Sequence, residues 1–498
     1  MFSKPIFKQS VQANWKLWAI LTLIASVIVS GFIMNYDAAA YASIASAAEG
    51  TVFSNMFSSM TSLLGSLENF YKLIGVILGI VYVVFTANSL VVAEVDSGSM
   101  AYTLSTPIRR SSVIFTKSLY LIGSVVLMYA IIALAGLGAS QLQYNNVTGY
   151  PITDDVEAAA EALNQDEAYL SERLYLIEED EQAMREAAVA RDMDTEAYSI
   201  YLEKVIFDRS YEEAAEIITD ERYDIYEDDE DMEDEDIEIT GEELTEQPAM
   251  ILENSDALNE GAKVQGISLN DYRAFLSEEI KVLEEGEEEP VVQEEDNQET
   301  QEGDAKPAVQ VTEDNAELLL QNIIESSAQA LNVSSDQVSD NLTLLKHEDA
   351  LKASTKMTGL NEEQVNMMAN HAMVSSARSV DDALEFDLET YVWLSVGILL
   401  LILAMSSISF FASTLFNSSG LALAIGGGIP FAFFLMTMVQ QLMDSSDVLD
   451  YFTITSLFDT DAIYTGGEFG WGLAALGGIT LVLYGASLLI FTKKDLPL

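Results

Sequence analysis

The sequence predicts an all-α membrane protein with six transmembrane helices, three before and three after a large, acidic and mostly helical insert. A spanning helix needs roughly 20 mostly apolar residues, and six such runs occur, none of them between Ser140 and Tyr391. The charge is divided in the same way. Residues 151–390 contain 68 acidic and 14 basic residues, whereas the rest of the chain contains 12 acidic and 9 basic residues. The chain is therefore divided between lipid and water.

The composition excludes several classes of protein. A formal net charge of −57 beside 49% hydrophobic residues does not suit a single globule, because mutual repulsion opposes compaction. The absence of cysteine excludes a disulfide framework, a thiol nucleophile and cysteine-ligated zinc or iron–sulfur sites. The acidic character also argues against a nucleic-acid partner, since phosphates are bound by basic surfaces.

The sequence predicts two membrane halves, residues 1–140 and 391–498, around an insert at residues 141–390. The predicted spans are Trp18–Met34, Leu73–Val92, Val113–Leu137, Val392–Phe416, Leu421–Leu442 and Trp471–Phe491. With a cytoplasmic N-terminus, all nine basic residues outside the insert except Lys72 fall on the cytoplasmic side, as the positive-inside rule requires. We therefore expect a multi-pass plasma-membrane protein with both termini cytoplasmic and residues 141–390 extracellular. An exported domain without disulfides suits a bacterium.

The first fifteen residues have the pattern of an interfacial helix. Phe7, Val11 and Trp15 share one face, and Lys4 and Lys8 can reach lipid headgroups. A simple positive flank of the first span explains the lysines equally well. A cleaved secretory signal is a poorer interpretation, because the apolar run is too long for one and the following small-residue stretch lies well beyond its end.

The predicted cytoplasmic loop between the second and third spans, residues 93–112, is short and polar and lies beside the bilayer. Pro107 disfavours helix at the preceding residue and can begin the next helix. The positive-inside rule explains the arginines of this segment but not the order of its other residues. That order is Glu94, Gly98, Leu104, Pro107, Arg109, Arg110 and Lys117.

This order resembles the permease subunits of ABC-2-type transporters. In that family a glutamate at the end of the second span is followed by a glycine, then Leu-x-x-Pro-x-x-Arg, then a lysine that enters the third span. The six-span layout, the N-terminal interfacial helix and the segment between spans five and six resemble the family as well. That last segment, residues 444–468, forms short helices that dip back at the outer face in the family. The acidic insert departs from the family, since many such permeases have only a short loop there.

The resemblance implies an ATP-driven transporter whose ATPase is a separate cytoplasmic subunit. By family analogy, we expect it to be an exporter. The sequence agrees, since it contains no Gly-x4-Gly-Lys-Ser/Thr phosphate-binding loop. The resemblance further implies that residues 93–112 transmit ATPase closure to the spans and that two permease chains line the path. ATP and magnesium would be held by the partner, so we expect no cofactor on this chain and no enzymatic activity of its own.

Two features of the predicted spans bear on mechanism. The fifth span contains Gly426, Gly427, Gly428 and then Pro430, which suits either a hinge or a close-packing site. No ionisable residue lies in the middle of a predicted span. This argues against a proton or ion relay, which needs buried carboxylates.

The insert is predicted to contain helices over residues 155–222, from Ser268 through Ile280, and over residues 315–384, where Asn361 is a predicted N-cap. Two acidic segments, residues 223–246 and 284–311, are predicted to lack fixed structure. The acidic segments lack the spaced ligands and central glycine of a calcium loop. His347 and His371 have no zinc or catalytic spacing, so we expect no metal site. The favoured interpretation is a solvated acidic surface; the alternative is a surface that attracts cationic cargo. The alternative function for the whole chain is a membrane-anchored receptor or assembly factor whose insert binds a partner without transport.

Overall fold

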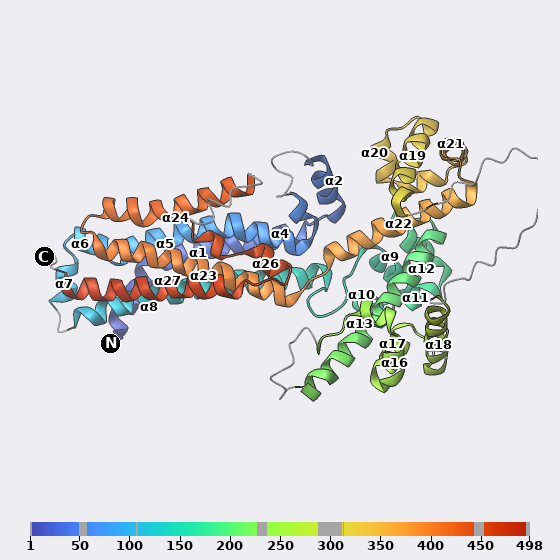
Figure 1. The fold of residues 1–498 in the computed structure, drawn as a ribbon. Coiled ribbons are helices and arrows are strands. Elements are labelled where there is room, and N and C mark those ends of the chain that lie inside the picture. Colours follow the sequence, from blue (N-terminus) through green and yellow to red (C-terminus); the bar gives the residue numbers. More distant parts are fainter. Residues whose placement is uncertain are drawn as a thin grey trace, which may run out of the picture. The chain divides into compact units, whose positions relative to one another are not determined.

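The protein is described here from a computed structural model, in which residues 2–48, 57–105, 108–226, 237–286, 311, 313–442 and 453–494 are described. Contacts divide the chain into two compact units (Figure 1). The membrane unit comprises Met1–Thr148 and Asp382–Leu498, and the insert unit comprises Gly149–Asp381. The insert unit is shorter at both ends than the predicted insert. The reason is that Asn146 Nδ2 donates a hydrogen bond to Leu384 O at 2.7 Å, which holds both connecting segments in the membrane unit.

All regular elements among the described residues are helical, and six helices are long and apolar enough to cross a membrane. The predicted all-α class with six spans is thus confirmed. The second span is a continuous run from Leu63 to Asp96, with a π-helical turn at Tyr71–Gly75. Its parts are α4 (Leu63–Phe70), η2 (Tyr71–Gly75), α5 (Val76–Leu90) and α6 (Val92–Asp96). The other spans are α1 (Lys4–Met34), α8 (Arg110–Tyr144), α23 (Leu388–Leu415), α24 (Ser419–Leu442) and α27 (Gly470–Lys493).

Helix α1 joins the predicted interfacial segment and the first span without a break. One face of its first half is buried at Ile6, Ser10 and Asn14, whereas Val11 and Trp15 are exposed. The Ser3 amide donates to Thr116 Oγ1 of α8 at 2.9 Å. The N-terminal turns therefore pack along α8, and the face on which the sequence placed Val11 and Trp15 stays outside, where lipid can contact it.

Helix α23 is the centre of the membrane unit. It is buried over most of its length and packs against α27, α24, α5 and α8, whereas α1, α24 and α27 are exposed over most of theirs. Exposed leucines on the outer helices are expected, because lipid is as apolar as a leucine side chain. At one end of α23, Tyr71 of the π-helical turn donates to Tyr391 at 3.2 Å and contacts Ser395 Oγ at 3.0 Å.

Short elements complete this unit. They are α2 (Ala38–Ala48), η1 (Ser59–Thr61), α7 (Met100–Leu104), η4 (Thr455–Leu457) and α26 (Thr460–Tyr464). The last two lie between the fifth and sixth spans, where the family resemblance implies short helices. Tyr451 and Phe452 of the same segment lie outside the described residues.

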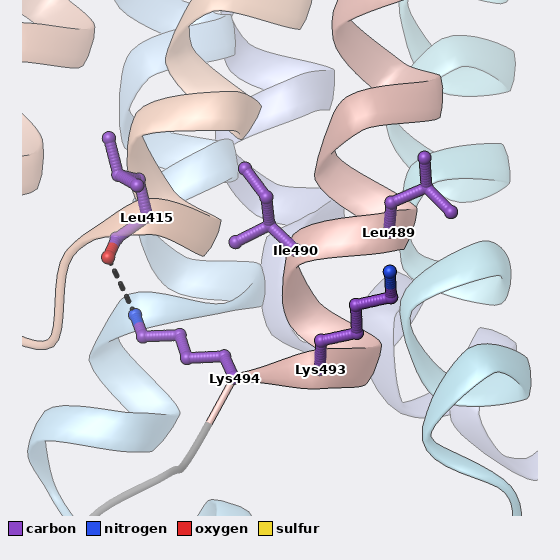
Figure 2. A pocket seen from close by; sticks show the side chains of 5 residues that line it. All are labelled: Leu415, Leu489, Ile490, Lys493 and Lys494. Carbon is purple, nitrogen blue, oxygen red and sulfur yellow. Dashed lines mark hydrogen bonds between the residues drawn. The ribbon is translucent and has the colours of Figure 1, made fainter.

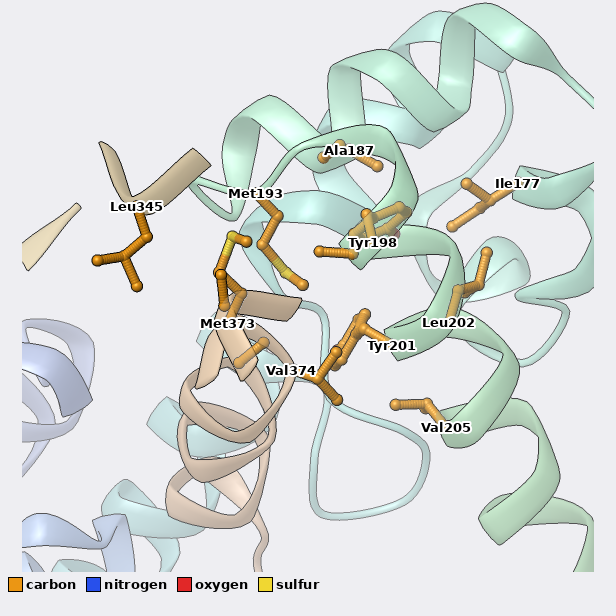
Figure 3. Packing of buried hydrophobic residues seen from close by; sticks show 14 of the residues in the cluster. Ile177, Ala187, Met193, Tyr198, Tyr201, Leu202, Val205, Leu345, Met373 and Val374 are labelled. Carbon is orange, nitrogen blue, oxygen red and sulfur yellow. The ribbon is translucent and has the colours of Figure 1, made fainter. Parts of the chain in front are cut away.

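The insert unit has two hydrophobic cores. The first joins α9 (Asp154–Leu163), α12 (Glu181–Ala190) and the first half of α13 (Thr195–Tyr226) to α22 (Glu362–Leu384). Figure 3 shows Tyr198 and Tyr201 of α13 on the side of Met373 and Val374 of α22, and Leu202 of α13 toward Ile177. The other helices around this core are α10 (Glu167–Ser171), α11 (Tyr175–Glu178), α19 (Glu313–Leu331), α20 (Ser335–Asp340), η3 (Leu342–Lys346) and α21 (Glu348–Thr358).

The second core packs the other half of α13 against α17 (Ser255–Val264) and α18 (Leu269–Gly286). Two short helices, α15 (Gly241–Glu246) and α16 (Ala249–Glu253), contribute to it. The prediction that residues 223–246 lack fixed structure is wrong for the described part, because α13 continues to Tyr226 and a Thr240–Glu243 capping box starts α15. Residues 227–236 and most of the predicted segment 284–311 lie outside the described residues.

A buried charged cluster ties the two ends of the insert unit together. Arg191 pairs with Asp155 at the start of α9 and with Asp381 near the end of α22, at 2.7 and 2.5 Å. Tyr198 donates to Asp155 at 2.9 Å, and Tyr201 donates to Asp381 at 2.6 Å. Burial by itself raises the pKa of Asp155, but the Arg191 guanidinium and hydrogen bonds from Thr153 and Tyr198 hold that pKa below its usual value. The sequence predicted a solvated acidic surface for the insert. Asp155 and Asp381 are instead part of a buried cluster.

Candidate functional site

The loop between the second and third spans carries a buried ion pair. Lys117 is 1% exposed, and its Nζ lies 2.7 Å from Glu94 Oε2. The same ammonium group donates to the Leu90 carbonyl at the end of α5. Lys117 therefore joins α8 to the C-terminal end of the second span through a charge and a backbone acceptor. Removing one partner of such a buried pair leaves an uncompensated charge and costs about 3–5 kcal/mol.

The turn after Glu94 is held by local hydrogen bonds. Gly98 has φ +73°, a conformation that side chains other than glycine adopt rarely, and a Cβ atom there would meet nothing within 4 Å. Glycine is thus required by the backbone conformation and not by crowding. Ser97 Oγ donates to the Ala93 carbonyl at 2.7 Å, and Ser99 Oγ donates to the Glu94 carbonyl at 3.2 Å. These bonds fix the direction in which the chain leaves α6.

The remaining motif residues lead into α8. Leu104 ends α7, and Pro107 lies outside the described residues. The next helix begins at Arg110, and Arg109, in extended conformation, is its N-cap residue. The helix thus starts three residues later than the sequence suggested, because Ile108 and Arg109 are not helical.

Arg110 connects the loop to the end of the sixth span. Its guanidinium donates to the Lys494 carbonyl at 3.0 Å. Lys494 in turn donates to the carbonyls of Thr414, Leu415 and Phe416 at 3.0, 2.7 and 3.1 Å. Figure 2 shows Lys494 reaching Leu415 beside a cavity of about 480 Å³ that Leu489, Ile490 and Lys493 also line. A cation at these carbonyls caps the C-terminus of α23, and partial burial lowers the pKa of Lys494.

A third contact joins the loop to the fifth span. Asp96 Oδ2 accepts a hydrogen bond from the Ser419 amide at 3.2 Å, at the start of α24. A carboxylate at a helix N-terminus is favourable, because it satisfies a free N–H group and complements the helix dipole. Together with the Arg110–Lys494 contact, this bond connects the loop directly to α24 and α27 and indirectly to α23.

The glycine run of the fifth span divides into packing and non-packing positions. A Cβ atom at Gly426 would lie 3.0 Å from Ala412 Cβ, and one at Gly427 would lie 2.9 Å from a methyl group of Val84. At Gly428 nothing lies within 4 Å. Helix α24 is continuous through Pro430. Gly426 and Gly427 therefore let α23 and α5 approach α24 closely.

The sequence prediction began the second span at Leu73 and therefore placed Glu68 and Lys72 outside it. Glu68 and Lys72 lie inside the continuous helix and form an ion pair at 2.5 Å. The signal was present, since the two residues have opposite charge at a spacing of four. They lie near the end of the helix opposite Glu94. Among the described residues, no group of three or more potential metal-ligating side chains is present.

A family model of ABC-2 family transporter proteins matches residues 7–155. This region of the chain is therefore similar to ABC-2 family transporter proteins, and the match supports an ABC-2-type permease. The ABC-2 region contains α1, the continuous second span, the loop with its Glu94–Lys117 pair, and α8. No curated protein matches the chain. The match and the six candidate spans support a membrane transport permease with several spans. Permeases of the matched family in general pair with an ABC ATPase and form dimers.

Proposed function

We propose that this chain is the transmembrane subunit of an ATP-driven exporter and that a separate cytoplasmic ATPase subunit acts on residues 93–112. The ABC-2 region supports a transport permease. The observation that carries the coupling proposal is the buried Glu94–Lys117 pair at 2.7 Å. If the loop moved while α5 and α8 stayed in place, the Glu94–Lys117 pair would separate. Separating a buried ion pair is costly, so movement of the loop displaces α5 and α8 as well.

The same contacts give the loop a route to the other half of the membrane unit. Asp96 holds the start of α24, and Arg110 holds the end of α27. Movement of the loop would therefore be passed to spans from both halves of the sequence. In this proposal two permease chains, identical or related, form the path. ATP and magnesium are held by the partner, and this chain supplies the mechanical connection.

We place both termini and the loop in the cytoplasm and the insert unit outside the cell. The distribution of basic residues supports this orientation. The 68 acidic residues of 151–390 would then form an external surface with a strongly negative potential, which concentrates cations near it. Cationic cargo is the class that such a surface would attract, before or after transport.

The neighbouring arginines allow the coupling proposal to be tested. Arg109 is exposed, whereas Arg110 is half-buried and donates to Lys494. The full chain is co-expressed with ABC-type ATPase subunits from the same organism, and co-purification and ATP hydrolysis are measured. We expect Arg109→Ala to weaken association about tenfold, as the loss of a charge-assisted contact does. Arg110→Ala is expected to preserve association but to abolish stimulation of ATP hydrolysis by the permease. Arg185→Ala, at an exposed position of the insert unit, is the matched control.

Two results would contradict the proposal. One is the failure of any ATP-binding subunit to co-purify with the folded wild-type chain. The other is normal association and stimulated hydrolysis in both arginine variants and in Glu94→Gln. Either result would favour a receptor or assembly factor whose insert unit binds a partner without transport.

A further inference from the structure

A polar cavity lies at the end of the second span opposite the coupling loop. Glu68 and Glu94 belong to the same candidate span, whose helix is interrupted only at Val91, and at about 1.5 Å per residue they lie about 40 Å apart. The cavity near Glu68 has a volume of about 430 Å³, which is within the range of small-molecule sites. Its walls come from η1, α4 and α26 and are formed by Ser58, Ser59, Thr61, Ser62, Gly65, Glu68, Asp461, Tyr464 and Thr465.

Glu68 is the buried charge of this cavity. The residue is 4% exposed. The two close contacts of its carboxylate, from Lys72 Nζ and from Thr460 Oγ1, each measure 2.5 Å and are both made by Oε1. Within the described part of the chain no ion pair or hydrogen bond reaches Oε2, so this oxygen remains for a ligand. A carboxylate buried within a candidate membrane span is costly and usually serves a function.

The cation that balances Glu68 lies on an irregular part of the helix. Lys72 belongs to the π-helical turn Tyr71–Gly75, and turns of this kind are frequent at functional sites. Lys72 Nζ also lies 3.6 Å from Asp461, whose side chain is 87% exposed. Lys72 thus lies between the carboxylates of Glu68 and Asp461. A second cation that enters the cavity can interact with the same two carboxylates.

The walls fit a ligand that has both an ammonium group and hydroxyl groups. Two carboxylates and one lysine give the site a net charge of −1. The other polar groups of the walls are almost all hydroxyls. The hydroxyl oxygens of Ser62, at the start of α4, and Tyr464, at the end of α26, lie 3.2 Å apart. Hydroxyl groups both donate and accept hydrogen bonds, so they complement the hydroxyls of a ligand without fixing its charge. The carboxylates supply the preference for a cation.

We propose that this cavity binds a singly charged organic amine that carries hydroxyl groups, with the ammonium ion at Glu68. The identification of such a ligand as cargo rests on the proposed transport function. Binding itself is a property of this chain alone and needs no ATPase. The cavity and the coupling loop lie at opposite ends of the second span. An amine bound at Glu68 is therefore also placed where it can shift the position of the loop on which the ATPase is proposed to act.

The test uses two sugars that differ in charge. Purified full-length protein in lipid nanodiscs is titrated with glucosamine, which is a cation, and with neutral N-acetylglucosamine, and the dissociation constants are measured by saturation-transfer NMR. Physiological salt screens diffuse attraction of the monovalent ion to the acidic insert. We expect glucosamine to bind at least about tenfold more tightly, and Glu68→Gln to remove that difference. Asp461→Asn is expected to weaken glucosamine binding about threefold, since its carboxylate is exposed.

Matched variants keep the result interpretable. Glu468→Gln removes the same charge from an exposed position of the same segment outside the cavity and is expected to leave binding unchanged. Asp461→Asn reports on the site if Glu68→Gln fails to fold. Equal binding of the two sugars, or glucosamine binding that neither Glu68→Gln nor Asp461→Asn weakens, would overturn the proposal. A chain that binds glucosamine but recruits no ATPase would keep this site and refute only the transport function.

Discussion

Two buried cations fix contacts between residues that are far apart in the sequence. Lys117 is almost fully buried and pairs with Glu94, and Arg191 joins Asp155 to Asp381. In both cases, a charge removed from water is balanced by carboxylates and by additional hydrogen bonds, which is the condition under which buried ions are tolerated. Such clusters specify an arrangement strongly, because any other arrangement leaves a charge unpaired.

The Arg191 cluster gives a prediction for acid stability. The pKa of Asp155 lies below its usual value in the folded state, so the folded state is stabilised above the ordinary carboxylate pKa, near pH 4, and loses this contribution as the pH falls through the lowered value. We expect Asp155→Asn to destabilise the insert unit by about 3–5 kcal/mol at neutral pH. The loss should become smaller at low pH. Hydrogen exchange of α9 and α22 in the full-length protein measures the effect.

The control for this prediction is Asp220→Asn, at an exposed position of α13. It should change exchange in α9 and α22 little at any pH. A variant at Asp155 that exchanges like the wild type at neutral pH would show that the cluster does not hold the ends of the insert unit together.

At the scale of elements, helix ends and glycine positions decide how the helices begin and pack. Asn361 was predicted to cap a helix, and its Oδ1 accepts from the Gln364 amide at 2.7 Å. Caps of this kind are local, so three or four adjacent residues suffice to recognise them. The glycine run of α24 is different, because the sequence does not show which glycine faces a neighbouring helix.

The glycine run gives the second prediction. Gly426→Ala places a methyl group 3.0 Å from Ala412 Cβ and 3.1 Å from Ser409 Cα, so α23 and α24 must separate or shift. We expect a loss of about 1–3 kcal/mol, typical of overpacking, measured as a lower thermal midpoint in detergent. Gly428→Ala is the matched control, since nothing lies within 4 Å of its added Cβ. A Gly426→Ala midpoint equal to that of Gly428→Ala would show that close packing is not what requires glycine here.

At the scale of the whole molecule, the chain combines a membrane unit and an insert unit, each with its own packing. The membrane unit is formed from both ends of the sequence, so the insert is accommodated where the ABC-2 region ends. A long insertion at such a connection costs little, because loop-closure entropy rises slowly with length. The insert unit then needs its own core, and it has two.

The proposed orientation of these units gives the third prediction. The chain contains no cysteine, so a single introduced thiol reports one position. Ser277 in α18 and Ser105 after α7 are both exposed. We expect a membrane-impermeant maleimide to label Ser277→Cys in intact spheroplasts and Ser105→Cys only after lysis. The opposite pattern would reverse the orientation, and labelling of both positions before lysis would exclude the proposed topology.

The sequence by itself determined the division between lipid and water, the six spans, the cap at Asn361 and the order of residues that resembles ABC-2 permeases. These features can be recognised along the chain, since a span depends on about 20 consecutive residues and a cap on three or four. Only the tertiary structure decided that Glu94 meets Lys117, that Arg191 joins the ends of the insert unit, and that Glu68 lines a cavity with Asp461. The physical reason is that the position of a charged residue in the sequence does not show which distant residue its side chain will meet. Whether an acidic side chain is solvated or buried depends on a partner that folding brings from a distance.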